Sequence, residues 1–445
     1  MRTVLIHAYE CAPYHRPGST IGAQRPYQFA KHLPKFGWRA IVLCCDFSRR
    51  YSLEPKGAWK EIVEQQVLDA LDSWNGMESL TIALPSLQYA DWVDRLWLKT
   101  VILDTEKGIF SPKPGFGRGL VRKISTFLKL FRGDHSQSWQ KVVLLAAETL
   151  QKRGWSIDVQ LAEHGPDASL FIARKLRERI PAIFDFRDPV DRDMNLASKF
   201  IFWSFVFKKF QFPKGVINVN EVLTAIDEKK FKKPTIKISN GFDLEDFFNF
   251  PEKLDQELLC IGWFGNIQSG QNIQPFFDAL KRLNPEIELK IIFRGSDAFR
   301  YQESLKETGK NILLDFKDPV PRKEALRLMQ SCDILLLLSL LAPEVEYLSQ
   351  GLIPGKTFEY LATLNPILVV PGDGAMLDAF ISENNYGKIG RNADQIAELI
   401  QEAYHQRIRK ESIWGIQYTQ EDIAAYSRGN QTRKLARFMD QLLST

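Results

Sequence analysis

The sequence is poor in cysteine and has no long apolar run, and each of these two features excludes one class of protein. Its 445 residues include five cysteines at scattered positions, without zinc-site or CxxC spacing. We therefore expect reduced thiols, no disulfide framework and no structural metal. No stretch reaches the roughly 18 apolar residues of a membrane-spanning helix. Residues 1–6 pass directly into a strand-like pattern without the features of a secretory leader, so we expect a cytoplasmic protein.

A large excess of charge of either sign is also missing. Lysine and arginine total 59 and aspartate and glutamate total 54, which gives a formal net charge of +5 at pH 7. This mild surplus suits a phosphate-rich ligand or an anionic surface. It is too small for a dedicated nucleic-acid binder, so we expect no nucleic-acid partner.

Short apolar runs rich in β-branched residues alternate with longer helical patterns along the chain. Residues 3–8 predict a strand, residues 23–36 a helix that ends at Gly37, and residues 40–45 the next strand. This opening implies a parallel sheet with helices on both faces. Later strands of the same sheet are predicted at residues 80–84, 158–162, 182–186 and 215–219.

A second alternation of the same kind begins near residue 258, after a turn-rich stretch at residues 240–255. Its predicted strands are residues 259–263, 289–294, 312–315, 334–338 and 367–370. We therefore expect an α/β protein of two Rossmann-like domains with parallel sheets, residues 1–245 and residues 246–420, and a ligand site in the cleft between them. We expect the charged amphipathic helix within residues 421–445 to pack back on the first domain.

The loop after the first predicted strand, residues 13–25, opens a helix and contains Gly18 and Gly22. Glycine lets a backbone approach a ligand, and a helix N-terminus attracts anions. The loop lacks the GxGxxG pattern, which argues against a nicotinamide dehydrogenase. A ligand loop with Gly22 at the ligand and a simple structural turn both fit this pattern.

Polar residues follow two predicted strands of the first domain. His164 comes after the strand at residues 158–162, and the charged run at residues 185–188 ends the strand at residues 182–186. The carboxyl ends of parallel strands face the ligand in an open α/β sheet. We therefore expect His164 and Asp188 at a substrate, where a carboxylate orients a hydroxyl. The alternatives are a structural or surface histidine and an ion-paired loop.

The second predicted domain carries candidate phosphate ligands at its strand ends. Gly265 follows the first strand and permits backbone contact with a diphosphate, and Arg294 ends the next strand with a guanidinium suited to phosphate. A later helix begins beside Lys356, and its N-terminus forms a natural diphosphate site. Glu359 shares a helix face with Lys356 and is placed to accept hydrogen bonds from both hydroxyls of a ribose. The alternative is a surface ion pair between these two residues.

Five groups of segments, in this order, carry a resemblance to glycosyltransferase family 4 and its GT-B fold. They are STIGAQRPYQFAKHLPKFGW, EHGPDASLFIARKL with FDFRDP, IKISNGFDLEDF, WFGNI, and GKTFEYLATLNPILVV, and the resemblance covers nearly the whole chain. It implies a nucleotide-sugar donor held by the second domain and an acceptor held by the first. It also implies retention of anomeric configuration, no metal or other cofactor, and catalysis by positioning and by stabilising the leaving diphosphate.

The family's donor motif, two glutamates spaced E-x7-E, is half present. Glu359 matches the second glutamate, which resembles a ribose ligand, while Gly351 stands at the first position. Glu344 and Glu346 lie upstream, and we expect them to contact the donor sugar instead.

The family's arginine and lysine after the first strand of the second domain are also absent, and Asn266 stands nearby. We therefore assign the phosphate role to Arg294 and Lys356. The expected donor site consists of Gly22, Gly265, Asn266, Arg294, Lys356 and Glu359. His164 and Asp188 are the expected catalytic residues on the acceptor side.

The resemblance implies a hexosyl-transferring enzyme of polysaccharide biosynthesis that acts on a glycan or a lipid-linked acceptor. Two alternatives stay open. One is a GT-B sugar-nucleotide epimerase, and the other is a catalytically inactive homologue that serves as a scaffold.

One segment predicts contact with a membrane surface. Residues 118–132 read RGLVRKISTFLKLFR, carry five basic residues and no acidic one, and repeat apolar residues at helical spacing. A basic amphipathic helix of this type lies in an anionic lipid interface. A second apolar run, residues 200–207, precedes Lys208 and Lys209. We expect peripheral binding at the inner membrane face, and the alternative is that both helices pack on the sheet with their charges in water.

Overall fold

The structure is a computed structural model. It describes residues 1–444 except 16–19, 48–51, 54–57, 75, 77, 88–100, 105–108, 113–136, 166, 190–195, 249–257, 269, 297, 306–310 and 341–351. The chain divides into two compact units. The first comprises Met1–Ser239 and Thr432–Thr445, and the second comprises Asn240–Gln431.

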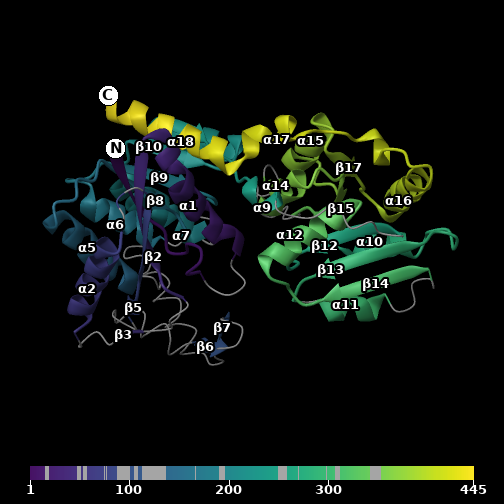
Figure 1. The fold of residues 1–445 in the computed structure, drawn as a ribbon, viewed down its shortest axis with the longest axis horizontal. Coiled ribbons are helices and arrows are strands. Elements are labelled where there is room, and N and C mark those ends of the chain that lie inside the picture. The colour runs from purple at the N-terminus through teal and green to yellow at the C-terminus, as the bar shows by residue number, and fades with distance from the viewer. Residues whose placement is uncertain are drawn as a thin grey trace. The chain divides into compact units, whose positions relative to one another are not determined.

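The first unit is built on a seven-stranded parallel sheet with the strand order β11-β10-β9-β8-β1-β2-β4 (Figure 1). The strands are β1 (Arg2–His7), β2 (Trp38–Cys45), β4 (Leu80–Leu84), β8 (Val159–Glu163), β9 (Ala182–Phe186), β10 (Gly215–Asn218) and β11 (Thr235–Lys237). Two small sheets pair β3 (Ser52–Leu53) with β5 (Ser86–Leu87) and β6 (Val101–Asp104) with β7 (Ile109–Pro112). The helices are α1 (Thr20–His32), α2 (Trp59–Asp72), α5 (Gln137–Lys152), α6 (Ala168–Leu176), α7 (Leu196–Ile201), α8 (Glu221–Phe231) and α18 (Arg428–Ser444), of which α18 belongs to this unit from Thr432 onward.

The side chains of β1 alternate between the two faces of the sheet, and both faces are buried. Val4 and Ile6 pack in one cluster with residues of α1 and α18, while Leu5 packs in another with residues of α2, α5 and α6. Successive side chains of a strand point to opposite faces, so one apolar run serves two helical layers. Because both faces are covered by helices, the polar groups of the strands collect at their ends.

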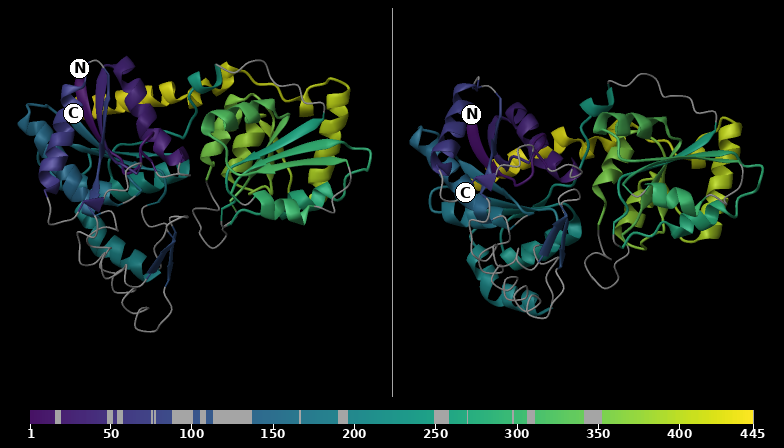
Figure 2. Two further views of the ribbon diagram at one scale, coloured as in Figure 1. Left: turned by 60° about the horizontal axis from the view of Figure 1, so that its bottom comes forward. Right: turned by 90° about the horizontal axis from the view of Figure 1, so that it is seen from below.

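The second unit repeats this architecture on a six-stranded parallel sheet with the order β14-β13-β12-β15-β16-β17. Its strands are β12 (Leu259–Phe264), β13 (Leu289–Arg294), β14 (Ile312–Lys317), β15 (Ile334–Leu338), β16 (Ile367–Val370) and β17 (Gly387–Ile389). Its helices are α9 (Glu245–Phe248), α10 (Gln274–Leu280), α11 (Ala298–Ser304), α12 (Arg322–Ser331), α14 (Gly355–Ala362), α15 (Met376–Glu383), α16 (Ala393–Ile408) and α17 (Gln420–Ile423). Figure 2 shows helices along both faces of this sheet.

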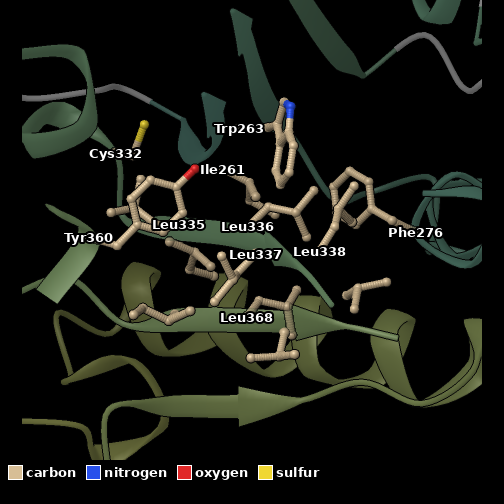
Figure 3. Close-up of a cluster of buried hydrophobic side chains, with 14 of the residues drawn as sticks. Ile261, Trp263, Phe276, Cys332, Leu335, Leu336, Leu337, Leu338, Tyr360 and Leu368 are labelled. Atoms are coloured by element: carbon tan, nitrogen blue, oxygen red, sulfur yellow. The ribbon is translucent and has the colours of Figure 1, made fainter. Parts of the chain in front are cut away.

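The core of the second unit surrounds the central strand β15. All five residues of β15 are buried, and Figure 3 shows Leu335–Leu338 between Trp263 of β12 and Leu368 of β16. A strand covered on both faces carries an unbroken apolar run instead of an alternating one. This rigid centre fixes the carboxyl ends of β12 and β13, where the candidate ligands lie.

The predicted α/β class with parallel sheets is confirmed, and the differences concern element ends and several short strands. The helix predicted at residues 23–36 begins earlier, at Thr20, and gives way after His32 to a 3-10 turn, Leu33–Phe36. Pro34 accounts for this change because proline lacks the amide N–H that continues an α-helix. The short strands β11 and β17 were not predicted, since three residues carry too little pattern.

All five cysteines are buried free thiols, as predicted. In the part of the chain that the structure describes, no helix combines the length and the apolarity that a bilayer span requires.

Candidate functional site

The carboxyl ends of β12 and β13 approach each other closely in the second unit. Gly265 follows β12 with a φ of 112°, a left-handed backbone that favours glycine, and its amide donates to the Arg294 carbonyl at 2.7 Å. A Cβ added to Gly295 would lie 2.5 Å from the Gly265 carbonyl oxygen. Gly265, which was predicted from the sequence, and Gly295 are therefore both required by the backbone itself.

Lys356, the second residue of α14, reaches this edge. Its Nζ donates to the Phe264 carbonyl at 3.0 Å and lies 3.7 Å from the centroid of the Trp263 ring. A Cβ added to Gly265 would lie 3.0 Å from this Nζ. Burial lowers the pKa of Lys356 to about 7, although Glu359 acts to raise it. A helix N-terminus and a partly buried amine thus lie together beside the glycine turn.

Glu359, one turn further along α14, faces other partners. Its carboxylate forms an ion pair with Arg322 of α12, and Arg322 also binds Asp246 of α9 at 2.9 Å. Glu359 is 8% exposed. Because the amine of Lys356 bonds to Phe264 and the carboxylate of Glu359 bonds to Arg322, the two are not the surface ion pair considered from the sequence. Arg322 and Asp246 were missed because they are distant in sequence and belong to no recognisable motif.

The side chains of Arg294 and Asn266 form hydrogen bonds to backbone and side-chain atoms of the protein itself. The Arg294 Nη2 donates to the Asp315 carboxylate at 2.8 Å, and its Nη1 donates to the carbonyls of Asp315 and Phe293. The Nε of Arg294 is buried and has no hydrogen-bond partner among the described residues. The Asn266 side chain accepts from the Ser296 amide at 2.8 Å. Arg294 therefore ties β13 to β14, and Asn266 shapes the loop between β13 and α11.

The remaining donor-side predictions fall into two groups. Glu344, Glu346 and Gly351 lie outside the described residues. Gly22 is in α1, and the side chain of Arg187 lies against it. A Cβ added to Gly22 would lie 2.6 Å from Nη1 of Arg187.

In the first unit, His164 and Asp188 follow β8 and β9 as predicted. The His164 Nε2 lies 2.8 Å from Oδ1 of Asp167, and its ring lies 5.3 Å from the ring of Phe186. Asp188 is partly buried. The structure thus places both residues at adjacent strand ends, and their contact with a substrate stays a prediction.

Two ion pairs lie at the same strand ends, and their members Arg25 and Glu163 were not singled out from the sequence. Arg25 of α1 binds Asp185 of β9 through two hydrogen bonds of 2.8 Å, with both side chains 1% exposed. It also donates to the Ser239 carbonyl at 3.1 Å. This bidentate geometry is the strongest form of a guanidinium–carboxylate pair. It anchors α1 to the sheet, so the charged run at residues 185–188 is partly the ion-paired loop considered as an alternative.

A second pair, Glu163 with Arg187, is incomplete. The Glu163 Oε1 lies 3.3 Å from the Arg187 Nε, yet both atoms are buried and neither has a hydrogen-bond partner among the described residues. Burial raises the pKa of Glu163 to about 7, although Arg187 acts to lower it. A buried polar group left without a partner costs about 1–3 kcal/mol. No sequence pattern singled out Glu163 beyond its place beside His164.

Comparisons with known proteins identify the fold. The sequence matches no family model and no curated protein. The N-terminal domain of trehalose-6-phosphate phosphatase from Candida albicans has a TM-score of 0.61 at 10% identity, over 99% of this chain and 97% of that chain.

Two further solved structures match over nearly their whole length. A glycosyltransferase from Rickettsia africae has a TM-score of 0.56 at 15% identity, over 100% of this chain and 99% of that chain. HepE from Anabaena, in complex with UDP-glucose, has a TM-score of 0.57 at 12% identity, over 99% and 100%. At these identities the likeness concerns the fold. The two parallel α/β units of this chain have the GT-B architecture of such glycosyltransferases.

Proposed function

We propose that this protein is a glycosyltransferase that moves a sugar from a nucleotide-sugar donor to an acceptor. The observation that carries the proposal is the arrangement of Lys356 in the second unit. A partly buried amine lies at the N-terminus of α14 and against the Gly265 turn, which is a favourable place for a diphosphate. The shared GT-B fold supports this proposal, and HepE with that fold was solved with UDP-glucose.

Glu359 is proposed as the ribose ligand of the same donor. Its Oε1 pairs with Arg322, and a carboxylate has a second oxygen that can accept hydrogen bonds from ribose hydroxyls. The ion pair with Arg322 holds this carboxylate in one orientation. Arg294 is a weaker candidate for the diphosphate because Asp315 binds its terminal nitrogens.

The proposed transfer retains anomeric configuration and needs no metal, as in glycosyltransferase family 4. An acceptor hydroxyl attacks the anomeric carbon from the face that the diphosphate leaves. The bond from carbon to the diphosphate oxygen breaks, and the diphosphate takes the proton of the hydroxyl. The protein then contributes positioning and stabilisation of the leaving group. Lys356 and the first amides of α14 supply that stabilisation.

The proposed acceptor is lipid-linked and is used at the inner face of a membrane. On the first unit, Phe200 and Phe205 are 70% and 62% exposed, and Lys208 and Lys209 are exposed directly after them. Exposed aromatic rings beside lysines favour an anionic lipid interface. The predicted amphipathic segment at residues 118–132 lies outside the described residues.

Flotation with phosphatidylglycerol vesicles tests the membrane proposal. The protein is expected to float at low salt and to be released at high salt. Replacing Phe200 and Phe205 with serine should abolish flotation, while Phe299→Ser, at an equally exposed phenylalanine of the second unit, should not. If all variants float alike, this surface is not the lipid contact.

A thermal-shift screen against UDP-, GDP-, ADP- and TDP-sugars tests the donor proposal. Binding of one nucleotide sugar, followed by an acceptor-dependent product, supports the transferase. Conversion of the sugar without an acceptor identifies a sugar-nucleotide epimerase. Failure to bind any of the four classes identifies a scaffold, which the glycine at position 351 keeps open.

A further inference from the structure

The amino edge of the first sheet, where β1, β2 and β8 begin, contains an open hollow of about 620 Å³. The residues of its lining that matter here are Arg2, Thr3, Arg39, Arg153, Trp155 and Asp158, and all belong to the first unit. His164 and Asp188 follow the opposite ends of the strands. The six residues of β1 separate the two edges by about 20 Å. The hollow is therefore distinct from the candidate sites described above.

The turn between α5 and β8 forms one wall of the hollow. The amide of Gly154, which has a φ of 83°, donates to the Gln151 carbonyl at 3.0 Å. The amide of Trp155 donates to the Leu150 carbonyl at 3.1 Å. Such bonds close the last turn of a helix where a glycine adopts the left-handed backbone. They leave Arg153 exposed and Trp155 partly buried, and both line the hollow.

Aromatic rings hold the guanidinium of Arg39, which lies on β2. Its Cζ lies 5.2 Å from the centroids of both the Trp74 and the Trp155 rings, and these two rings lie 4.9 Å apart. The Nε of Arg39 is enclosed, whereas the two terminal nitrogens keep accessible surface and form no hydrogen bond within the described part of the chain. An arginine can stack on aromatic rings and still present its terminal nitrogens to a phosphate.

The charges around the hollow leave two guanidiniums without a carboxylate. Arg2 forms an ion pair with Asp440 of α18 at 2.8 Å. The guanidiniums of Arg39 and Arg153 form no ion pair with any residue that the structure describes. Asp158 is the acidic residue of the lining. Three arginines and two aspartates together leave one positive charge in excess, so the hollow favours an anion.

A phosphate monoester matches the two unpaired guanidiniums. At pH 7 it carries about 1.5–2 negative charges and three terminal oxygens, and its bonds to guanidiniums are of the strong, charge-assisted kind. A carboxylate brings one charge and two oxygens, and an uncharged sugar brings no charge. Small-molecule sites have volumes of about 300–1,000 Å³, so this hollow has room for an organic group beside the phosphate.

We propose that the hollow is a second ligand site, which binds the phosphate monoester group of an organic molecule through Arg39 and Arg153. Arg39 is the oriented cation, because the two tryptophan rings hold its plane, and Arg153 contacts the phosphate from the turn. Asp158 repels the phosphate and limits its affinity. The site does not depend on the proposed glycosyl transfer. The same monoester group occurs on free metabolites and on the head group of phosphatidic acid, and the test separates these two sources.

Isothermal titration calorimetry of the full-length protein at low salt tests the site with glucose 6-phosphate and glycerol 3-phosphate. Glucose and glucuronate are the uncharged and the carboxylate controls. At least one monoester is expected to bind at least tenfold more tightly than either control. Arg153→Gln and Arg39→Gln should each weaken this binding about tenfold. Asp158→Asn should strengthen it about threefold, because the charge is lost while an oxygen remains to accept from the Thr3 amide, as the carboxylate does at 2.6 Å.

Arg179→Gln is the matched control, because Arg179 is an exposed arginine of the same unit outside the hollow, and it should leave the affinity unchanged. Thermal unfolding shows whether each variant is folded. Arg153 is exposed, so Arg153→Gln tests the site even if Arg39→Gln does not fold. Binding of glucuronate as tight as that of the monoesters, or unchanged affinity in the folded arginine variants, would overturn the site and leave Arg39 as a packing residue.

Flotation with vesicles that contain phosphatidic acid separates the two sources of the ligand. Binding of a soluble monoester supports the site and assigns a free metabolite. Flotation that Arg153→Gln weakens, without binding of a soluble monoester, supports the site and assigns a lipid head group. If neither the soluble monoesters nor the vesicles bind, the proposal fails.

Nucleotide-sugar binding is measured with the same variants. Arg153→Gln should bind a nucleotide sugar as the wild type does, because the hollow and the proposed donor site lie in different units. Loss of both ligands in this variant would overturn the proposal of a separate site. Absence of nucleotide-sugar binding in the wild type concerns the proposed transferase alone.

Discussion

Replacing Lys356 with methionine should raise the stability of the second unit and weaken its proposed binding of a nucleotide sugar. The amine has a pKa of about 7 in the folded chain and an ordinary value of 10.5, so at pH 7 unfolding takes up about half a proton per molecule. Keeping the amine buried therefore costs on the order of 4 kcal/mol at that pH. Lys356→Met removes this penalty while filling the same space. The variant is expected to unfold at a higher temperature than the wild type.

The same substitution should weaken nucleotide-sugar binding, and the pH dependence gives the magnitude. If the diphosphate binds the protonated amine, about one tenth of the free protein is competent at pH 8 and about nine tenths at pH 6, given the pKa of about 7. The dissociation constant of the wild type should therefore rise about tenfold from pH 6 to pH 8. A nucleotide sugar is a suitable probe because its diphosphate diester does not titrate in this range.

Isothermal titration calorimetry with UDP-glucose, and then with GDP-, ADP- and TDP-sugars, measures both effects. In the wild type, the binding enthalpy at pH 8 should change with the ionisation enthalpy of the buffer, which reports proton uptake. Lys356→Met should show neither the pH dependence nor the buffer dependence. Lys281→Met, at an exposed lysine of the same unit, is the control and should behave as the wild type. A variant that binds the donor as tightly as the wild type at pH 6 would refute the reasoning.

Three further predictions concern other residues and the absence of a metal. Glu359→Gln should weaken nucleotide-sugar binding by about 2 kcal/mol, because a charged hydrogen-bond acceptor is lost. Calorimetry measures this change, and wild-type affinity in the variant would show that Glu359 is not part of the donor site. Burial lowers the pKa of His7 from 6.5 to about 4, so unfolding takes up a proton between these pH values, and the free energy of unfolding falls by about 3 kcal/mol as the pH drops through this window. Urea titrations at pH 4 and pH 7 should show a smaller fall in the free energy of unfolding for His7→Gln than for the wild type. Equal falls in the two proteins would contradict the assignment. Sugar transfer should continue in the presence of EDTA, since the proposed stabilisation of the leaving group comes from Lys356 and α14. If EDTA abolishes transfer and Mg²⁺ or Mn²⁺ restores it, the reaction depends on a metal.

The fold could be predicted from the sequence because its signals are local. The unbroken apolar run of β15 and the alternating helical patterns need no distant partner to be read. Glycine at position 265 was predicted to serve backbone approach, and the structure requires it there through a positive φ. Lys356 was located because a helix start follows proline and glycine in the sequence.

The ion pairs of the candidate sites could not be predicted in the same way. Arg25 meets Asp185 across 160 positions, and Arg322 meets Asp246 across 76. Such pairs depend on how distant elements pack, which no local pattern records. Arg294 is a different case: its place at a strand end suggested a phosphate ligand, and the neighbouring strand supplies Asp315 as a partner that no local pattern indicated. Glu163 was overlooked because burial of a carboxylate cannot be read from residue type.

The most direct test of the account is transfer of a labelled sugar. The wild-type protein is incubated with labelled UDP-, GDP-, ADP- and TDP-sugars and a membrane lipid extract, and the label in the lipid fraction is counted. The account predicts that one of these donors labels the lipid fraction with the wild type, and that Lys356→Met reduces this labelling at least tenfold at pH 6. No labelled lipid with any donor, or equal labelling by the variant, would contradict the central claim.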